Sequence, residues 1–143
     1  VVAWANGRPL GPATVDEFGV VYLGETDASE ALVGLRITAD LETLEPHFGD
    51  VQTIRDKRKT IANVRFLIQE SHTIWAGKDV DHLFKTRSLP QDTPGSPVSV
   101  HTGLAEVQIT NGWDNPGRVA IRHTEPSPLA VLAIIPEVTL GDA

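Results

Sequence analysis

Short stretches of alternating apolar and polar residues recur along this chain. The alternation is clearest in LRITADL (35–41), TIANVRFLIQE (60–70), LAEVQIT (104–110) and RVAIRH (118–123). A period of two is typical of strands that bury one face and expose the other, as in antiparallel sheets. FGVVYLGE (18–25) is a further strand candidate, and LAVLAII (129–135) suits a strand that is covered on both faces and ends at Pro136. We therefore predict a mainly β fold, either an antiparallel sandwich or a barrel-like domain.

Two other stretches lack this alternation. DVDHLFKTR (79–87) begins with Asp and carries cations near its end, which matches the dipole of a helix, so we predict one short helix there. SLPQDTPGSP (88–97) contains three prolines and a glycine without a periodic pattern, and it is predicted to be an internal loop. The chain has 143 residues, and we expect residues 1–143 to form a single β-rich domain.

Composition narrows the classes of function. A formal net charge of -7 argues against non-specific binding of nucleic acid or membrane by the whole surface. The absence of Cys excludes disulfides and Cys-ligated metal sites. The longest apolar run, LAVLAII, is far shorter than the roughly 20 residues that a membrane span needs. Because the chain begins at Val1 and has no Met, we expect it to be a piece of a larger protein.

One run is strongly basic, since RDKRK (55–59) holds four cations in five residues. Extending the following strand back through this run predicts one core face and one polar face. The core face would carry Ala62, Val64, Phe66 and Ile68, and the polar face would carry Lys57, Lys59, Asn63, Arg65 and Gln69. A second strand adds two cations on its non-core face, which gives a candidate basic stripe of Lys57, Lys59, Arg65, Arg118 and Arg122. A solvated surface, contact with DNA phosphates and contact with another subunit all remain open as its role.

Other residues with chemical potential form no recognised motif. The five histidines show no HxH or HExxH spacing, and Asp79, Asp81 and His82 lack the spacing of a calcium loop, so we expect no metal site. Glu42 and Glu45 are a carboxylate pair that surface acidity explains equally well. Trp4, Trp75 and Trp113 lie in turn-like contexts, where they either anchor loops by packing or offer stacking platforms for sugars or bases. We predict no catalytic residues and no cofactor.

Several segments, in order, resemble the C-terminal region of tail nozzle proteins of short-tailed phages, also called tail tubular protein B. The segments are VGLRITADLETLE (33–45), RDKRKTIANVRFLIQES (55–71), WAGKDVDHL (75–83), HTGLAEVQI (101–109) and NPGRVAIRHTEPSPLAVLAIIPEV (115–138). They cover roughly the last three quarters of the chain. Arg36 stands where the family usually has Pro, and Asp56 stands where Gly is common before the basic run.

The resemblance implies a structural role without enzymatic activity. Nozzle proteins are virion components that form hexameric rings below the portal and adaptor and line the channel for DNA ejection. This chain would be the C-terminal part of such a protein, located in the phage tail, with copies of itself, the portal or adaptor and other tail proteins as partners. DNA would pass transiently, without specific binding, and no membrane would be involved. Two alternatives stay open from the residues alone: a non-catalytic β-sandwich module that binds glycans or a host surface through its loop tryptophans, and a small hydrolase.

Overall fold

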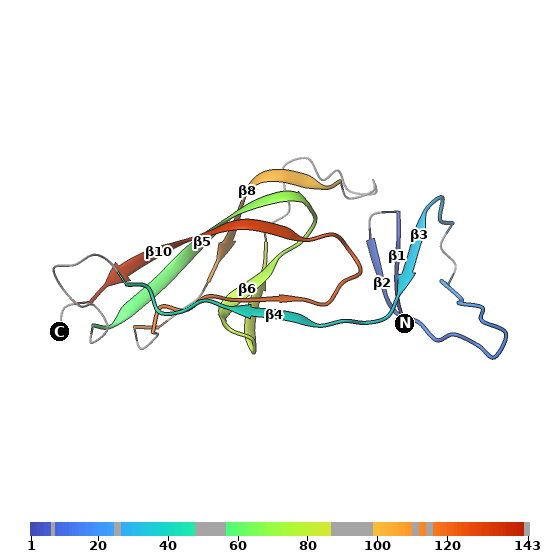
Figure 1. Ribbon diagram of the computed structural model, residues 1–143, viewed down its shortest axis with the longest axis horizontal. Coiled ribbons are helices and arrows are strands. Elements are labelled where there is room, and N and C mark those ends of the chain that lie inside the picture. The colour runs from blue at the N-terminus through green and yellow to red at the C-terminus, as the bar shows by residue number, and fades with distance from the viewer. Residues whose placement is uncertain are drawn as a thin grey trace.

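The computed structural model describes residues 1–6, 8–24, 27–47, 57–86, 99–109, 112–113 and 116–141. These residues form ten strands in three antiparallel sheets and no helix, which confirms the mainly β prediction (Figure 1). The predicted loop at 88–97 lies outside the described residues. A small sheet at one end of the molecule has the order β2-β1-β3 and contains β1 (Val2–Ala5), β2 (Arg8–Pro12) and β3 (Ala31–Gly34).

The other two sheets form the body of the molecule. The first has the order β10-β5-β8 and contains β5 (Lys59–Ser71), β8 (His101–Gln108) and β10 (Ala130–Leu140). The second has the order β4-β9-β6-β7 and contains β4 (Ala39–Glu42), β6 (Trp75–Asp79), β7 (His82–Lys85) and β9 (Ala120–His123). Their inner faces share one hydrophobic core, in which Phe66 and Val107 of the first sheet pack with Ala76 and Ile121 of the second.

A β-bulge near the start of β5 reverses the faces of the residues that precede it. Opposite β10, Val64 pairs with Pro136 while Ile61 pairs with Val138, so β5 has one residue more than its partner between these points. Val64, Phe66 and Ile68 are buried as predicted, but Ala62 is exposed and Ile61 is buried instead. Lys59 therefore points inward and is only 1% exposed, so its predicted place on the exposed polar face is wrong.

The helix predicted for residues 79–87 is wrong, because a β-hairpin occupies this region. β6 and β7 pair antiparallel, and Asp79 lies at the turn between them. Its Oδ1 accepts hydrogen bonds from the backbone N–H groups of Asp81 (2.9 Å) and His82 (2.8 Å). A capping Asp at a helix start accepts the same kind of bonds, so the residue that suggested a helix serves the turn equally well.

β10 is an edge strand, which corrects the prediction for LAVLAII. We expected a strand covered on both faces, but Leu132 and Ile135 are exposed and β10 ends its sheet. The strand also continues through Pro136 to Leu140 instead of ending there. An edge strand tolerates proline because the missing N–H falls where no neighbouring strand has to accept it.

The small N-terminal sheet is held by the side chain of Asn6, which follows β1 in a left-handed conformation (φ 48°). Its Oδ1 accepts hydrogen bonds from the backbone N–H (3.1 Å) and Oγ (3.0 Å) of Ser29, and its Nδ2 donates to the carbonyl of Asp27 (2.9 Å). Asn tolerates such a conformation better than other residues that have a side chain. The amide thus joins the first turn of the chain to the segment that leads into β3.

Candidate functional site

The five cations of the candidate basic stripe do not lie on one surface. Lys59 is buried, and its Nζ donates to the carbonyl of Lys57 at 3.4 Å. Arg65 lies on the outer face of the β10-β5-β8 sheet, where its cross-strand neighbour is Glu106, and the Nε–Oε2 distance is 3.8 Å. Lys57 precedes β5 and is partly buried. Of the three cations in this segment, Arg65 alone lies on the exposed strand face, as the alternation predicted.

Arg118 and Arg122 belong to the other sheet, and each faces carboxylates. Arg122 Nε and Nη2 donate to the two carboxylate oxygens of Asp40 at 2.7 Å and 2.8 Å. This fork-like contact lowers the pKa of Asp40 below its ordinary value and raises the pKa of Arg122. Arg118 lies 3.2 Å from Glu42 and 3.5 Å from Glu45. The two arginines therefore meet carboxylates of their own chain on this surface.

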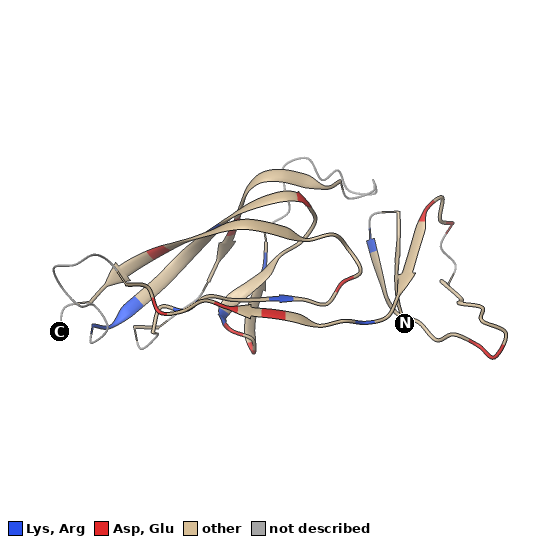
Figure 2. Cartoon of the chain, in the orientation of Figure 1, with Lys and Arg blue, Asp and Glu red and all other residues tan. Residues whose placement is uncertain are grey.

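No continuous positive surface results from these placements. Arg65 and Arg122 lie on the outward faces of two sheets that are packed with their inner faces together, so they point away from each other. Acidic and basic residues are interspersed over the strands of the body in Figure 2. The basic stripe required that the polar faces of its two strands adjoin. Among the described residues, these two faces do not adjoin.

Of the three candidate tryptophans, Trp75 is the best placed for a ligand contact. It lies in a row of cross-strand neighbours on the second sheet. In this row Arg122 pairs with Trp75, which pairs with Lys85. The Nε1 of Trp75 donates to Glu125 at 3.4 Å, and the Nζ of Lys85 lies 5.9 Å from the centre of the ring. The indole thus has partners at its edge and on one face within the chain, as expected for packing.

The other two tryptophans also have intramolecular contacts. Trp4 meets His72 edge to face, with ring centroids 4.7 Å apart, and so connects the small sheet to the body. Trp113 lies against Gly141, where an added Cβ would come within 3.1 Å of the ring. These contacts agree with the packing interpretation of all three side chains.

The titratable residues offer little as a ligand site. His82 Nδ1 lies 2.7 Å from Asp79 Oδ1, and this contact is the main cause of a lowered pKa of Asp79. Within the described ranges, no three His, Asp or Glu side chains are grouped so that they could hold a metal ion. The same ranges contain no helix of the length and apolarity needed to cross a membrane.

The most unusual surface is formed by apolar residues that we had predicted to be buried in the core. The apolar residues of LRITADL were expected to be buried on one strand face, but Leu35 is 80% exposed, Ile37 is 73% exposed and Leu41 is 50% exposed. Leu41 pairs with the buried Ile121, so both point to the inner side of their sheet. Leu41 nevertheless remains open, because β4 is the edge of that sheet. The alternation predicted a strand across 35–41, but only β4 (Ala39–Glu42) is a strand, all four of its residues are exposed, and residues 35–38 lie outside any strand.

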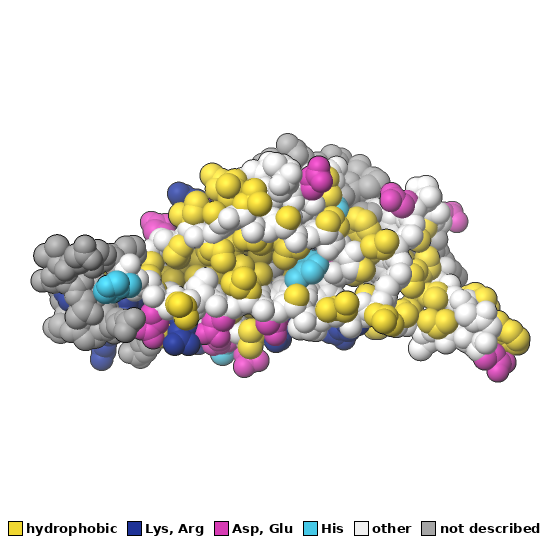
Figure 3. Space-filling model, viewed as in Figure 1, with side chains coloured by type: hydrophobic (Ala, Val, Ile, Leu, Met, Phe, Trp, Pro, Cys, Tyr) yellow, Lys and Arg dark blue, Asp and Glu magenta, His cyan; other side chains and the backbone are white. Residues whose placement is uncertain are grey.

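The opposite edge of this opening is β10. Its inward residues Val131, Ile134 and Val138 are only partly buried against the core, whereas Phe66 and Ile68 on the neighbouring strand are completely buried. Figure 3 shows hydrophobic side chains gathered on this side of the molecule, between β10 and β4. We call this opening, bounded by β10 on one side and by residues 35–44 with β4 on the other, the seam.

Comparisons with known proteins do not identify a family. No family model matches the chain, and no curated protein matches it.

Proposed function

We propose that this chain is a non-catalytic structural component of a phage tail, part of the nozzle that surrounds the DNA ejection channel, and that it acts by assembling with copies of itself. The observation that carries the assembly role is the exposure of three apolar side chains, Leu35, Ile37 and Leu41, on β4 and on the segment that leads into it. Exposed apolar patches of this kind mark surfaces that bind other proteins. The ordered resemblance of segments 33–45 to 115–138 supports the choice of a tail nozzle among such assemblies.

The distribution of charge supports a surface past which DNA moves without being held. Each phosphate that a cation neutralises adds a salt-dependent attraction. Arg65, Arg118 and Arg122 already face carboxylates of their own chain, so they are less available to phosphates. Together with the net charge of -7, this arrangement favours weak attraction to DNA over tight binding.

The proposal is tested on the complete protein that contains this chain. Antibodies raised against the 143-residue chain should label the tails of virions in electron microscopy, and the purified full-length protein should form rings with a central channel. Labelling confined to other parts of the particle, or to no particle, would contradict the tail assignment.

The glycan-binding alternative makes a different prediction. A glycan platform needs an open aromatic face, whereas Lys85 lies over Trp75 and Gly141 lies against Trp113. A glycan array probed with the chain and with its Trp75→Ala and Trp113→Ala variants separates the two functions. Binding by the parent that either substitution removes would favour the module over the tail component.

A further inference from the structure

We propose that the seam of one copy binds the N-terminal arm of a second copy, residues 13–24, through the exposed apolar side chains at the turn of the arm. The arm leads from β2 towards β3 and contains a turn around Phe18. The proposal deepens the assembly role given above and rests on it for the closure of a ring. The occupant is inferred from two complementary features of one chain: apolar residues along the seam that no described element covers, and an arm whose apolar side chains pack against no sheet.

The seam lacks a cover on one side of the body only. On the other side, β7 lies beside β8, so the two sheets approach each other there. On the seam side, β4 and β10 are both terminal strands of their sheets, and no strand of the described residues pairs with their outer edges. The apolar residues beside these two edges suit the docking of apolar side chains from another protein.

The arm has the composition of a strand but is not incorporated into one. FGVVYLGE was predicted as a strand from its sequence, yet its described residues form only an isolated bridge between Val15 and Val21. Phe18 is 83% exposed and Tyr22 is 76% exposed. These large apolar surfaces stay in water in the single chain, and their burial against a partner is favourable by roughly 25 cal/mol per Å².

The turn of the arm is internally fixed, so it presents these side chains without much loss of freedom on binding. Asp16 Oδ1 accepts hydrogen bonds from the N–H groups of Phe18 (3.0 Å) and Val20 (2.7 Å). The N–H of Asp16 donates to the carbonyl of Val20 at 3.0 Å, and Gly19 supplies the left-handed residue that the turn needs (φ 80°). Pre-organisation of this kind lowers the entropic cost of association.

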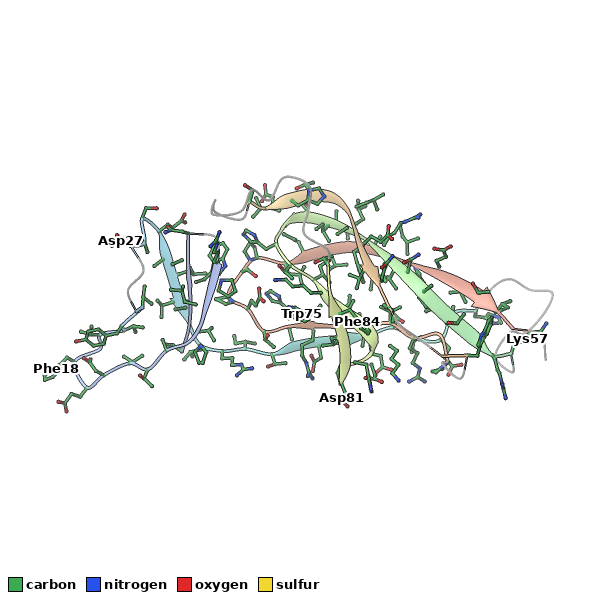
Figure 4. All side chains as sticks on the ribbon, turned by 180° about the vertical axis from the view of Figure 1, so that it is seen from behind. Phe18, Asp27, Lys57, Trp75, Asp81 and Phe84 are labelled. Atoms are coloured by element: carbon green, nitrogen blue, oxygen red, sulfur yellow. The ribbon has the colours of Figure 1, made fainter. Side chains whose placement is uncertain are left out.

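The position of the arm makes the contact intermolecular. Phe18 and Lys57 lie at opposite extremities of the elongated molecule in Figure 4, and the arm extends away from the body. Lys57 precedes β5, whose first residue pairs with the last residue of β10 at the far end of the seam. The arm therefore lies far from that end of its own seam, so a contact there involves the arm of a neighbouring copy.

Charge favours a head-to-tail arrangement. The arm contains Asp16 and Glu17 but no Lys or Arg, whereas the far end of the seam adjoins the basic residues Lys57 and Arg58. An acidic turn at one extremity and a basic run at the other attract each other between successive copies. Such a heterologous contact closes into a ring when the rotation between copies permits, and it gives an open chain otherwise.

Sedimentation velocity of the 143-residue chain over a range of concentrations tests whether copies associate through the arm and the seam. Wild type should form species larger than a monomer. Tyr22→Asp in the arm and Leu44→Asp in the seam should each raise the dissociation constant by about a hundredfold or more, because each buries an unpaired charge. Leu104→Asp is the matched control, since Leu104 is 58% exposed on the outer face of the other sheet. A monomeric wild type, or unimpaired assembly of either variant, would overturn the proposal, and far-UV circular dichroism checks that the variants are folded.

Mixing the two variants tests the head-to-tail geometry. Tyr22→Asp retains an intact seam and Leu44→Asp retains an intact arm, so the mixture should form a one-to-one dimer and nothing larger. Because the chain has no Cys, Val20→Cys on one copy and Leu44→Cys on another should form a disulfide only when mixed. Absence of both the dimer and the disulfide would contradict the arm–seam contact.

The results also separate this inference from the tail assignment. If the disulfide forms but antibodies fail to label tails, the arm–seam contact stands and the phage role falls. If tails are labelled but the chain shows neither disulfide nor variant effects, the role stands and the contact falls.

Discussion

The body and the small N-terminal sheet of this molecule are stabilised in different ways. The body encloses a core in which Ile61, Val64, Phe66 and Ile74 are completely buried. The N-terminal sheet buries Val2, Ala3 and Ala5, none of which belongs to that core cluster, and it depends on the hydrogen bonds of Asn6. Apolar burial dominates folding energetics, so the body should unfold as one unit while the small sheet opens at a lower cost.

The largest effect should come from the core of the body. Phe66→Ala should lower the free energy of unfolding by about 3–5 kcal/mol, because it removes a buried ring and leaves a cavity. Leu32→Ala in β3, where the side chain is half exposed, is the control and should cost far less. Urea denaturation followed by circular dichroism measures both, and equal losses would refute the difference between the two regions.

A second change probes the bulge that turns Lys59 inward. Lys59→Gln should destabilise the chain by about 1–3 kcal/mol, because a shorter side chain loses packing and leaves an amide in the interior. Arg65→Gln is the matched control on the exposed face of the same strand and should change stability by less than about 0.5 kcal/mol. If the two variants melted alike, Lys59 would instead lie at the surface.

A third change acts on the small sheet alone. Asn6→Ala removes the acceptor of Ser29 and the donor to Asp27, and should speed amide hydrogen exchange in residues 1–6 and 27–34 by about tenfold. Exchange in β5 and β8 should not change. Faster exchange throughout the body would show that the two regions unfold together.

The smallest effect is the pH dependence of the Asp40–Arg122 pair on the surface of the body. The folded-state pKa of Asp40 lies below its ordinary 3.8, so its contribution to stability is present above that pH and is lost as the pH falls through the folded pKa. Asp40→Asn should be slightly less stable than wild type at pH 7, and the difference should shrink as the pH falls below 3.8. A constant difference across that range of thermal melts would exclude this linkage.

Sequence patterns predicted the faces of regular strands well. Ala105, Val107 and Ile109 are buried as the alternation in LAEVQIT indicated, and Arg118 and Arg122 point outward as predicted. In these strands each side chain is set by a period of two and one covering layer, both of which are local properties.

The failures have physical causes that a period cannot encode. The alternation near Lys59 is broken by an inserted residue, and nothing in the side chains marks where a bulge lies. The prediction for residues 35–41 failed for another reason: only the short edge strand β4 forms there, and sequence does not reveal which layer, if any, covers it. The candidate basic stripe depended on both points, which is why its members are scattered.

The bulge at the start of β5 has an evolutionary consequence. It amounts to a single residue, so loss of one codon near Ala62 would restore strict alternation while Ile61 and Lys59 kept their inward positions. Straightening β5 with all its residues retained would instead turn Lys57 and Lys59 outward beside Arg65 and expose Ile61. The burial of Ile61 opposes that change, so the inward position of Lys59 is preserved whether or not the extra residue is kept.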